Sequence, residues 1–139
     1  MSDDLYQGRM MELARQEDGR LDAPDASVTL DNPLCGDRVT IDLRRDASDR
    51  IVELGHTVRG CVLCRAAATV LGEHAEGQDA AALAAVRAGL RAHLRREGER
   101  PADPRWADLA VFDAVAPHKS RHECVLLPFE AVLEALGRD

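Results

Sequence analysis

Two runs of alternating apolar and polar residues constrain the fold of this 139-residue chain most strongly. A period of two is typical of a strand with one buried face. The connection between the runs, "RRDASDR", is short and polar, so the runs predict an antiparallel hairpin. The positions predicted to face inward are Val39, Ile41 and Leu43 in the first run and Val52, Leu54, His56 and Val58 in the second.

Helical patterns flank this hairpin. "DLYQGRMMELARQ" predicts a short helix with Leu5, Tyr6, Met10 and Leu13 on one side, and "EDGRLDAPDASVTLDNP" after it is interpreted as an irregular connection. Beyond the hairpin, "VLCRAAATVLGEHAEG" predicts an Ala-rich helix that ends between Gly72 and Gly77.

Three further helices are predicted in the C-terminal half. Asp79 is expected to cap the first, whose apolar stripe is Leu83, Val86, Leu90 and Leu94 and whose basic face carries Arg87, Arg91, Arg95 and Arg96. The second begins at Asp103-Pro104, with Trp106, Leu109 and Phe112 as core. The third lies in "CVLLPFEAVLEALGRD" and stops at Gly137. Residues 1–139 are therefore expected to form one α+β domain, with helices on one face of a small antiparallel sheet.

Charge and hydropathy narrow the functional classes. The net charge of −7 argues against nucleic acid as a partner, because nucleic-acid binding needs a basic footprint. No apolar run has membrane-spanning length, and "MSDDLYQGRM" does not resemble a signal peptide, so we expect no membrane partner and a cytoplasmic location. In that reducing compartment, cysteines serve metal binding or catalysis more often than disulfides.

The four cysteines lie at predicted element boundaries. Cys35 precedes the first strand and Cys61 follows the second, so the hairpin should make them neighbours in space. Cys61 and Cys124 lie near helix starts, where free N–H groups favour the thiolate. Asp37, two residues after Cys35, should point to the same side. A carboxylate beside thiolates can complete a tetrahedral metal site and is displaced more readily than a fourth thiolate.

Three segments resemble the cysteine blocks of the IscU/SufU/NifU N-terminal scaffold family: "NPLCGDRVTIDLRRD", "HTVRGCVLCRAAATVLGEHAEG" and "SRHECVLLPFEAVLEAL". The long interval between Cys61 and Cys124, and Arg121 shortly before Cys124, are more similar to the SufU branch. The other branch has His directly before this cysteine, where this chain has Glu123.

The resemblance implies a SufE/NifU-like fold and a scaffold for iron–sulfur cluster assembly, with no small-molecule turnover beyond a sulfurtransferase role. It implies that Cys35, Cys61 and Cys124 are thiolate ligands, that Asp37 is a labile ligand, and that Cys124 accepts persulfide sulfur. The implied cofactor is a zinc ion or a transient iron–sulfur cluster. The implied partners are a cysteine desulfurase and apo iron–sulfur acceptor proteins.

Cys64 departs from the family pattern, which has a small residue there. Three interpretations stay open: a buried small residue, a fourth metal ligand, or a redox partner of Cys61. The second would make the protein a structural four-cysteine zinc domain that acts as an interaction module, and the third a dithiol redox protein. The family's "NPRN"-like stretch is also missing, since "RQEDGRLDAPDAS" occupies that region.

Overall fold

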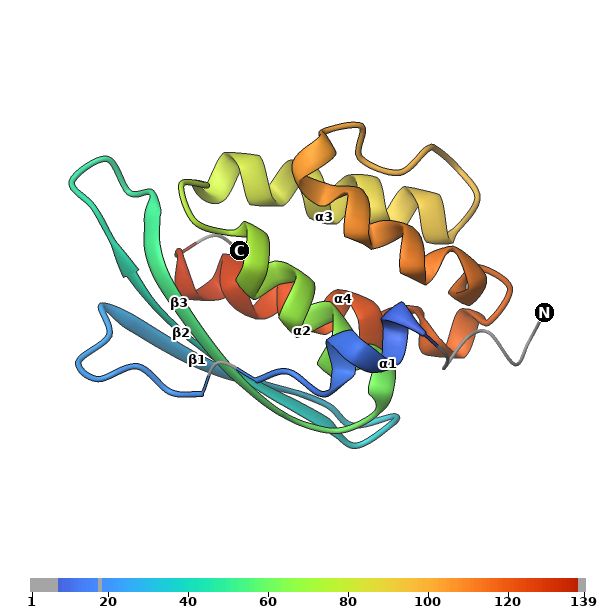
Figure 1. Ribbon diagram of the computed structural model, residues 1–139, viewed down its shortest axis with the longest axis horizontal. Coiled ribbons are helices and arrows are strands. Elements are labelled where there is room, and N and C mark those ends of the chain that lie inside the picture. The colour runs from blue at the N-terminus through green and yellow to red at the C-terminus, as the bar shows by residue number, and fades with distance from the viewer. Residues whose placement is uncertain (1–7, 18, 138–139) are drawn as a thin grey trace.

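The fold is a three-stranded antiparallel sheet with helices packed on one face, as Figure 1 shows. The computed structural model describes residues 8–17 and 19–137. In chain order the elements are α1 (Arg9–Ala14), β1 (Ala26–Asn32), β2 (Asp37–Arg45), β3 (Ile51–Arg59), α2 (Val62–His74), α3 (Ala80–Leu94), the 3-10 helices η2 (Pro104–Val115) and η3 (Lys119–Arg121), and α4 (His122–Ala135). Helix α4 packs against β1 and β2, and α2 packs against β3. The predicted α+β architecture is confirmed.

The predicted hairpin is confirmed as β2 and β3, whose antiparallel pairing runs from Arg38 opposite Arg59 to Arg45 opposite Ile51. The inward face of β2 is buried as expected. The prediction for Val52 was wrong, because this side chain is 44% exposed. The register shifts between Arg44 and Arg45, and this irregularity turns Ile51 into the core in place of Val52.

One strand was missed. The segment interpreted as irregular contains β1, which pairs with β2 from Ala26 opposite Leu43 to Asn32 opposite Asp37. Its side chains alternate between exposed and half-buried until Asn32, so the apolar half of the pattern is weak. The strand order is β1-β2-β3. At the end of the sheet that carries the cysteines, the start of β2 therefore lies between the other two strands.

Asp42 lies on the sheet face opposite the helices, yet its side chain is fully buried. Residues 19–25 cross that face, and from them the Arg20 guanidinium (Nε, 2.6 Å) and the Leu21 N–H (3.1 Å) donate to the Asp42 carboxylate. The Ser27 hydroxyl of β1 donates to the same carboxylate at 2.5 Å. Burial alone would raise the pKa of Asp42, but these donors, Arg20 first, hold it below its ordinary value.

Replacing Asp42 with asparagine is expected to lower the free energy of unfolding by about 1–3 kcal/mol near neutral pH, because a charged acceptor for three donors is lost. A depressed folded-state pKa stabilises the protein above the unfolded value of about 3.9, and this contribution disappears as the pH falls through the folded value. Urea unfolding at pH 7 and pH 3 checks this. Equal differences between the two proteins at both pH values would contradict it.

The predicted helices are present. Asp79 caps α3 by accepting from the Ala82 N–H at 2.9 Å, and the four apolar residues of its stripe are buried. Asp103 accepts from the Arg105 N–H, but the helix that follows is the 3-10 helix η2, with non-helical backbone at Trp106. Gly137, at φ 82°, ends α4. None of the helices within residues 8–17 and 19–137 is long and apolar enough to cross a membrane.

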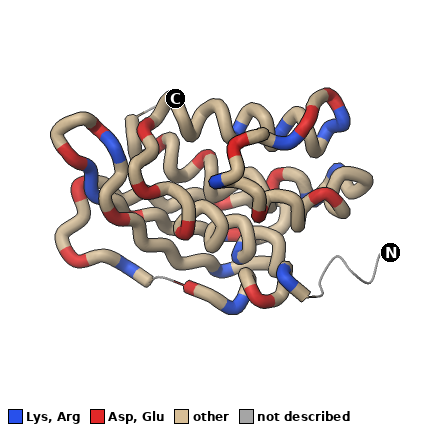
Figure 2. The backbone as a smooth tube through the Cα atoms, turned by 45° about the horizontal axis from the view of Figure 1, so that its top comes forward, with Lys and Arg blue, Asp and Glu red and all other residues tan. Residues whose placement is uncertain are grey.

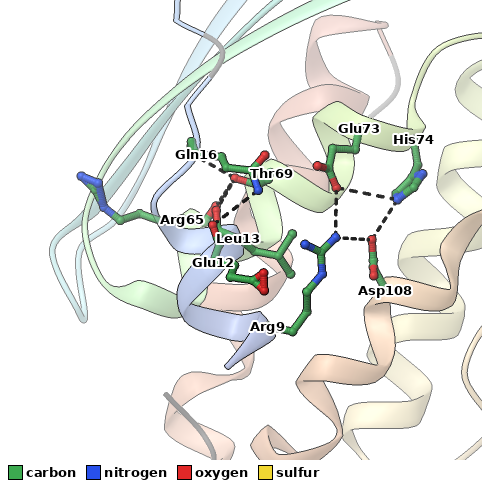
Figure 3. Close-up of polar contacts among 9 residues, drawn as sticks. All are labelled: Arg9, Glu12, Leu13, Gln16, Arg65, Thr69, Glu73, His74 and Asp108. Carbon is green, nitrogen blue, oxygen red and sulfur yellow. Dashed lines mark hydrogen bonds and ion pairs between the residues drawn. The ribbon is translucent and has the colours of Figure 1, made fainter. Parts of the chain in front are cut away.

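Helix α1 confirms part of the N-terminal prediction. Met10 and Leu13 are buried, while Leu5 and Tyr6 lie outside the described residues. The Thr69 hydroxyl of α2 contacts the Leu13, Gln16 and Arg65 carbonyl oxygens at 2.7, 3.2 and 3.1 Å, as Figure 3 shows. These contacts join the C-terminal end of α1 to α2, the helix that Cys61 precedes.

The basic face of α3 is only partly solvated. Arg87 and Arg91 each donate to the Glu130 carboxylate of α4 at 3.1 Å, so this pair of arginines joins the two helices. Arg95 and Arg96 are exposed. Figure 2 shows acidic and basic residues interspersed along the loops and helix ends.

Candidate metal and sulfur site

The turn between β1 and β2 presents Cys35 at the end of the sheet. Gly36, at φ 73°, takes a left-handed conformation that suits glycine. The Gly36 N–H donates to the Asn32 carbonyl oxygen at 2.8 Å, and the Leu34 N–H donates to the Asn32 side chain at 3.1 Å. These bonds define the turn and leave Cys35 exposed. Asn32, 8% exposed, has this supporting role, which the Asn-Pro opening of the motif could have indicated.

Asp37, the first residue of β2, lies at the centre of the cluster and is 1% exposed. One carboxylate oxygen, Oδ1, accepts from the backbone N–H of Cys61 at 2.9 Å. The other oxygen, Oδ2, lies 3.2 Å from Cys35 Sγ and 3.6 Å from Cys61 Sγ. The hairpin thus brings Cys35 and Cys61 to the same carboxylate, and Asp37 points toward Cys35 as the sequence predicts.

The missing side chain of Gly60 makes room for this carboxylate. A Cβ atom at position 60 would lie 2.2 Å from Asp37 Oδ1 and 2.9 Å from its Cγ. No side chain fits there without moving Asp37. The sequence indicates a close backbone approach at Gly60-Cys61, and the structure identifies Asp37 as the group that approaches.

Cys124 reaches the cluster from the first turn of α4. Its sulfur lies 3.1 Å from the Cys35 sulfur, and the residue is fully buried. One potential ligand atom from each of Cys35, Asp37 and Cys124 lies within 4.8 Å of the others. Residues 35–37 and the start of α4, far apart in the sequence, therefore bring together one carboxylate and two thiols, and the Cys61 sulfur lies at the margin of this cluster.

Cys61 and Cys64 have different surroundings. Cys61 is the N-cap residue of α2 and is half-buried, in agreement with its predicted place at a helix start. Cys64, one turn into the helix, is fully buried among the apolar core residues. Burial, followed by the negative charge of Asp37, raises the pKa of the Cys64 thiol. Its placement fits the interpretation as a small buried residue.

Burial also affects the pKa values of the convergent thiols. It raises the pKa of Cys124, and hydrogen bonds with Cys35 and Asp37 raise it further. Burial likewise raises the pKa of Cys35. Burial therefore opposes the thiolate that the position of Cys124 at a helix start favours.

A second group of potential ligands lies elsewhere, between α1, α2 and η2. Glu73, His74 and Asp108 each place one ligand atom within 4.8 Å of the others. The Arg9 guanidinium already lies 3.1 Å from Asp108 and 3.7 Å from Glu73, as Figure 3 shows. This group is an ion-pair cluster that connects α1 to α2 and η2.

The chain is similar to known proteins along most of its length. Residues 5–125 match the family model of the NifU-like N terminal domain. The chain is 27% identical over 120 residues to the iron-sulfur cluster assembly scaffold protein IscU of Streptococcus pyogenes serotype M1, a match that covers 86% of this chain and 74% of that protein.

Solved structures show the same fold. The N-terminal part of a nitrogen-fixing NifU-like protein from Brucella abortus has a TM-score of 0.89 and 33% identity, covering 97% of this chain and 94% of that one. A putative iron-sulfur cluster assembly scaffold protein for the SUF system from Fervidobacterium islandicum AW-1 has a TM-score of 0.85 and 22% identity, covering 98% and 99%. The fold and the family match together show that this chain belongs to the NifU-like N-terminal domain family of iron–sulfur cluster assembly scaffold proteins.

Proposed function

We propose that this protein builds a transient iron–sulfur cluster, or relays sulfur for one, on Cys35, Cys61, Cys124 and Asp37, and then passes the product to acceptor proteins. The observation that carries the proposal is the convergence of the Cys35 thiol, the Cys124 thiol and the Asp37 carboxylate within 4.8 Å. Cys61 supplies the third thiol, 3.6 Å from Asp37 Oδ2. Cytoplasmic action, with a cysteine desulfurase as sulfur donor, is part of the same proposal.

The donor atoms suit zinc or iron. Thiolates bind both metals, and one oxygen ligand among three thiolates keeps the set less tightly closed than four thiolates would. Zinc–sulfur bonds of about 2.3 Å in a tetrahedral site separate two sulfurs by roughly 3.8 Å. The Cys35 and Cys124 sulfurs, 3.1 Å apart, therefore need to separate by less than about 1 Å.

Metal uptake must release protons at this site. The raised pKa values of Cys35 and Cys124 keep both thiols protonated near neutral pH when no metal is bound. A metal binds the thiolate, so each of these ligands loses its proton on binding. The apparent affinity for metal accordingly rises with pH.

Sulfur transfer would use Cys124 as the acceptor. Cys124 first loses its thiol proton, and its thiolate then attacks the terminal sulfur of a persulfide on the donor protein. A new S–S bond forms at Cys124, and the S–S bond of the donor breaks. The donor cysteine leaves as a thiolate, so no external oxidant or reductant is needed. Because Cys124 is buried beside the exposed Cys35, the donor must approach from the Cys35 side.

Metal stoichiometry in cysteine variants tests the proposed ligand set. Replacing Cys35 or Cys124 with serine is expected to remove most of the bound zinc or iron, whereas Cys64→Ala should keep the wild-type stoichiometry and lose only about 1 kcal/mol of stability from the core. Metal analysis of the purified variants, beside their thermal unfolding, measures both effects.

The same experiment distinguishes the two other classes of protein. Loss of metal in Cys64→Ala would make the site a four-cysteine zinc structure. A wild-type metal stoichiometry in Cys35→Ser would contradict the proposed site. It would favour the interpretation of Cys61 and Cys64 as a dithiol redox pair.

A further inference from the structure

Leu34 is the most exposed large hydrophobic side chain among residues 8–17 and 19–137, at 92% exposure. Val52, at 44%, is the next such residue and lies at the other end of the sheet. Leu34 directly precedes Cys35 at the tip of the β1–β2 turn. A single exposed leucine needs no explanation in general, but this one stands beside the exposed thiol of the site.

The turn holds Leu34 in place without using its side chain. The Leu34 N–H donates to the Asn32 side chain at 3.1 Å, and the Gly36 N–H donates to the Asn32 carbonyl oxygen at 2.8 Å. Pro33 restricts the backbone just before it. The turn is thus built from backbone groups and Asn32, so the fold places no requirement for an apolar side chain at position 34.

The burial of the cysteines determines the direction from which a protein can reach the thiols. Cys124 and Cys64 are buried and Cys61 is half-buried, whereas Cys35 is exposed. A partner cysteine that exchanges sulfur must come within van der Waals contact of a thiol at this site. Its surface would then cover the neighbouring Leu34.

The surroundings of Leu34 resemble the edge of a protein interface. At the same end of the sheet, a shallow cavity of about 230 Å³ is lined by Asp31 of β1, Gly36 of the turn, Arg38 of β2 and Arg59 of β3. Arg38 donates to Asp31 at 2.7 Å, and both side chains are about half exposed. An apolar residue bordered by exposed charged groups is the usual anatomy of a specific protein interface.

We propose that Leu34 is the apolar anchor by which a sulfur-donor protein docks over the thiols. This inference rests on the proposed function, and it specifies the partner as a protein with an apolar pocket beside its persulfide-bearing cysteine. Because Leu34 is almost fully exposed in the free protein, its burial in the complex would contribute its whole side-chain area to affinity.

Leu34→Ser is expected to weaken binding to a cysteine desulfurase about tenfold or more, which corresponds to burial of one leucine side chain. Val52→Ser is the matched control, because it removes the other exposed aliphatic residue far from the site and should leave affinity unchanged. Leu34→Met should restore near wild-type affinity. Biolayer interferometry with purified desulfurase gives the dissociation constants, and metal content and thermal unfolding should match the wild type in all three variants.

The outcomes separate the two proposals. If wild-type protein binds the desulfurase and Leu34→Ser binds it equally well, the anchor is wrong and the proposed function stands. An equal loss in Leu34→Ser and Val52→Ser would also overturn the anchor. If the wild-type protein does not bind a desulfurase at all, both the sulfur-relay function and the proposed role of Leu34 are wrong.

Discussion

Asp37→Ala is expected to slow the release of bound metal about tenfold, a barrier change of about 1.4 kcal/mol. Three thiolates and a carboxylate place four negative charges around a divalent ion, and removing one carboxylate relieves part of that repulsion. The carboxylate can also leave the metal and keep a hydrogen bond, because Asp37 Oδ1 already accepts from the Cys61 N–H at 2.9 Å. A ligand that can leave the metal and keep a hydrogen bond lowers the barrier to release, and alanine offers no such route.

Zinc transfer to a chromogenic chelator measures this release. Asp31→Ala is the matched control, since it removes an exposed carboxylate from the neighbouring strand β1 with the same change in charge. Loss of the bond to Cys61 N–H should lower the stability of Asp37→Ala by about 1–2 kcal/mol without loss of the fold. Asp37→Asn keeps an acceptor for that N–H and separates the structural effect from the charge. Faster release from Asp37→Ala, with the fold intact, would contradict the labile-ligand role.

Gly60→Ala is expected to reproduce the slow release of Asp37→Ala, although residue 60 has no ligand atom. Its new Cβ would lie 2.2 Å from Asp37 Oδ1, so the carboxylate must leave its position between the thiols. The methyl group would also lie 3.1 Å from the Asp37 Cα, and this overpacking should cost about 1–3 kcal/mol of stability. The same chelator assay and urea unfolding measure the two effects.

A double variant decides whether Gly60 acts through Asp37. If it does, Gly60→Ala combined with Asp37→Ala should release zinc at the rate of Asp37→Ala alone, because the group that the methyl displaces is already gone. Gly98→Ala is the matched control, since a Cβ there meets only the Ala92 methyl at 3.4 Å. Additive effects on the release rate would show that Gly60 influences the site by another path.

The site could be predicted from the sequence because it depends on the hairpin. Alternation at Val39, Ile41 and Leu43 is strong, and an antiparallel turn then places Cys35 and Cys61 at one end of the sheet. The strand β1 escaped prediction because its side chains are at most half-buried up to Asn32. Val52 was misplaced because the pairing of β2 with β3 shifts register between Arg44 and Arg45, which reverses the side chains of β3 that face inward there.

Other properties of the site depend on packing that no sequence pattern describes. The spacing of Cys61 and Cys64 places them on one face of α2, but the depth of that face in the core separates their environments. The position of Cys124 at a helix start predicts a thiolate, while its complete burial favours the thiol. The contact between Gly60 and Asp37 joins the residue after β3 to the start of β2, so it appears only when the two strands are in register.

Cluster transfer tests the central claim most directly. The protein is reconstituted anaerobically with iron, cysteine and a cysteine desulfurase, and the cluster is then followed by absorbance as it passes to an apo-ferredoxin. The site described here predicts that wild-type protein assembles a cluster and hands it over, and that Asp37→Ala assembles one but transfers it about tenfold more slowly. A wild-type protein that assembles no cluster under these conditions, while binding zinc in a form that a chelator cannot remove, would contradict the account.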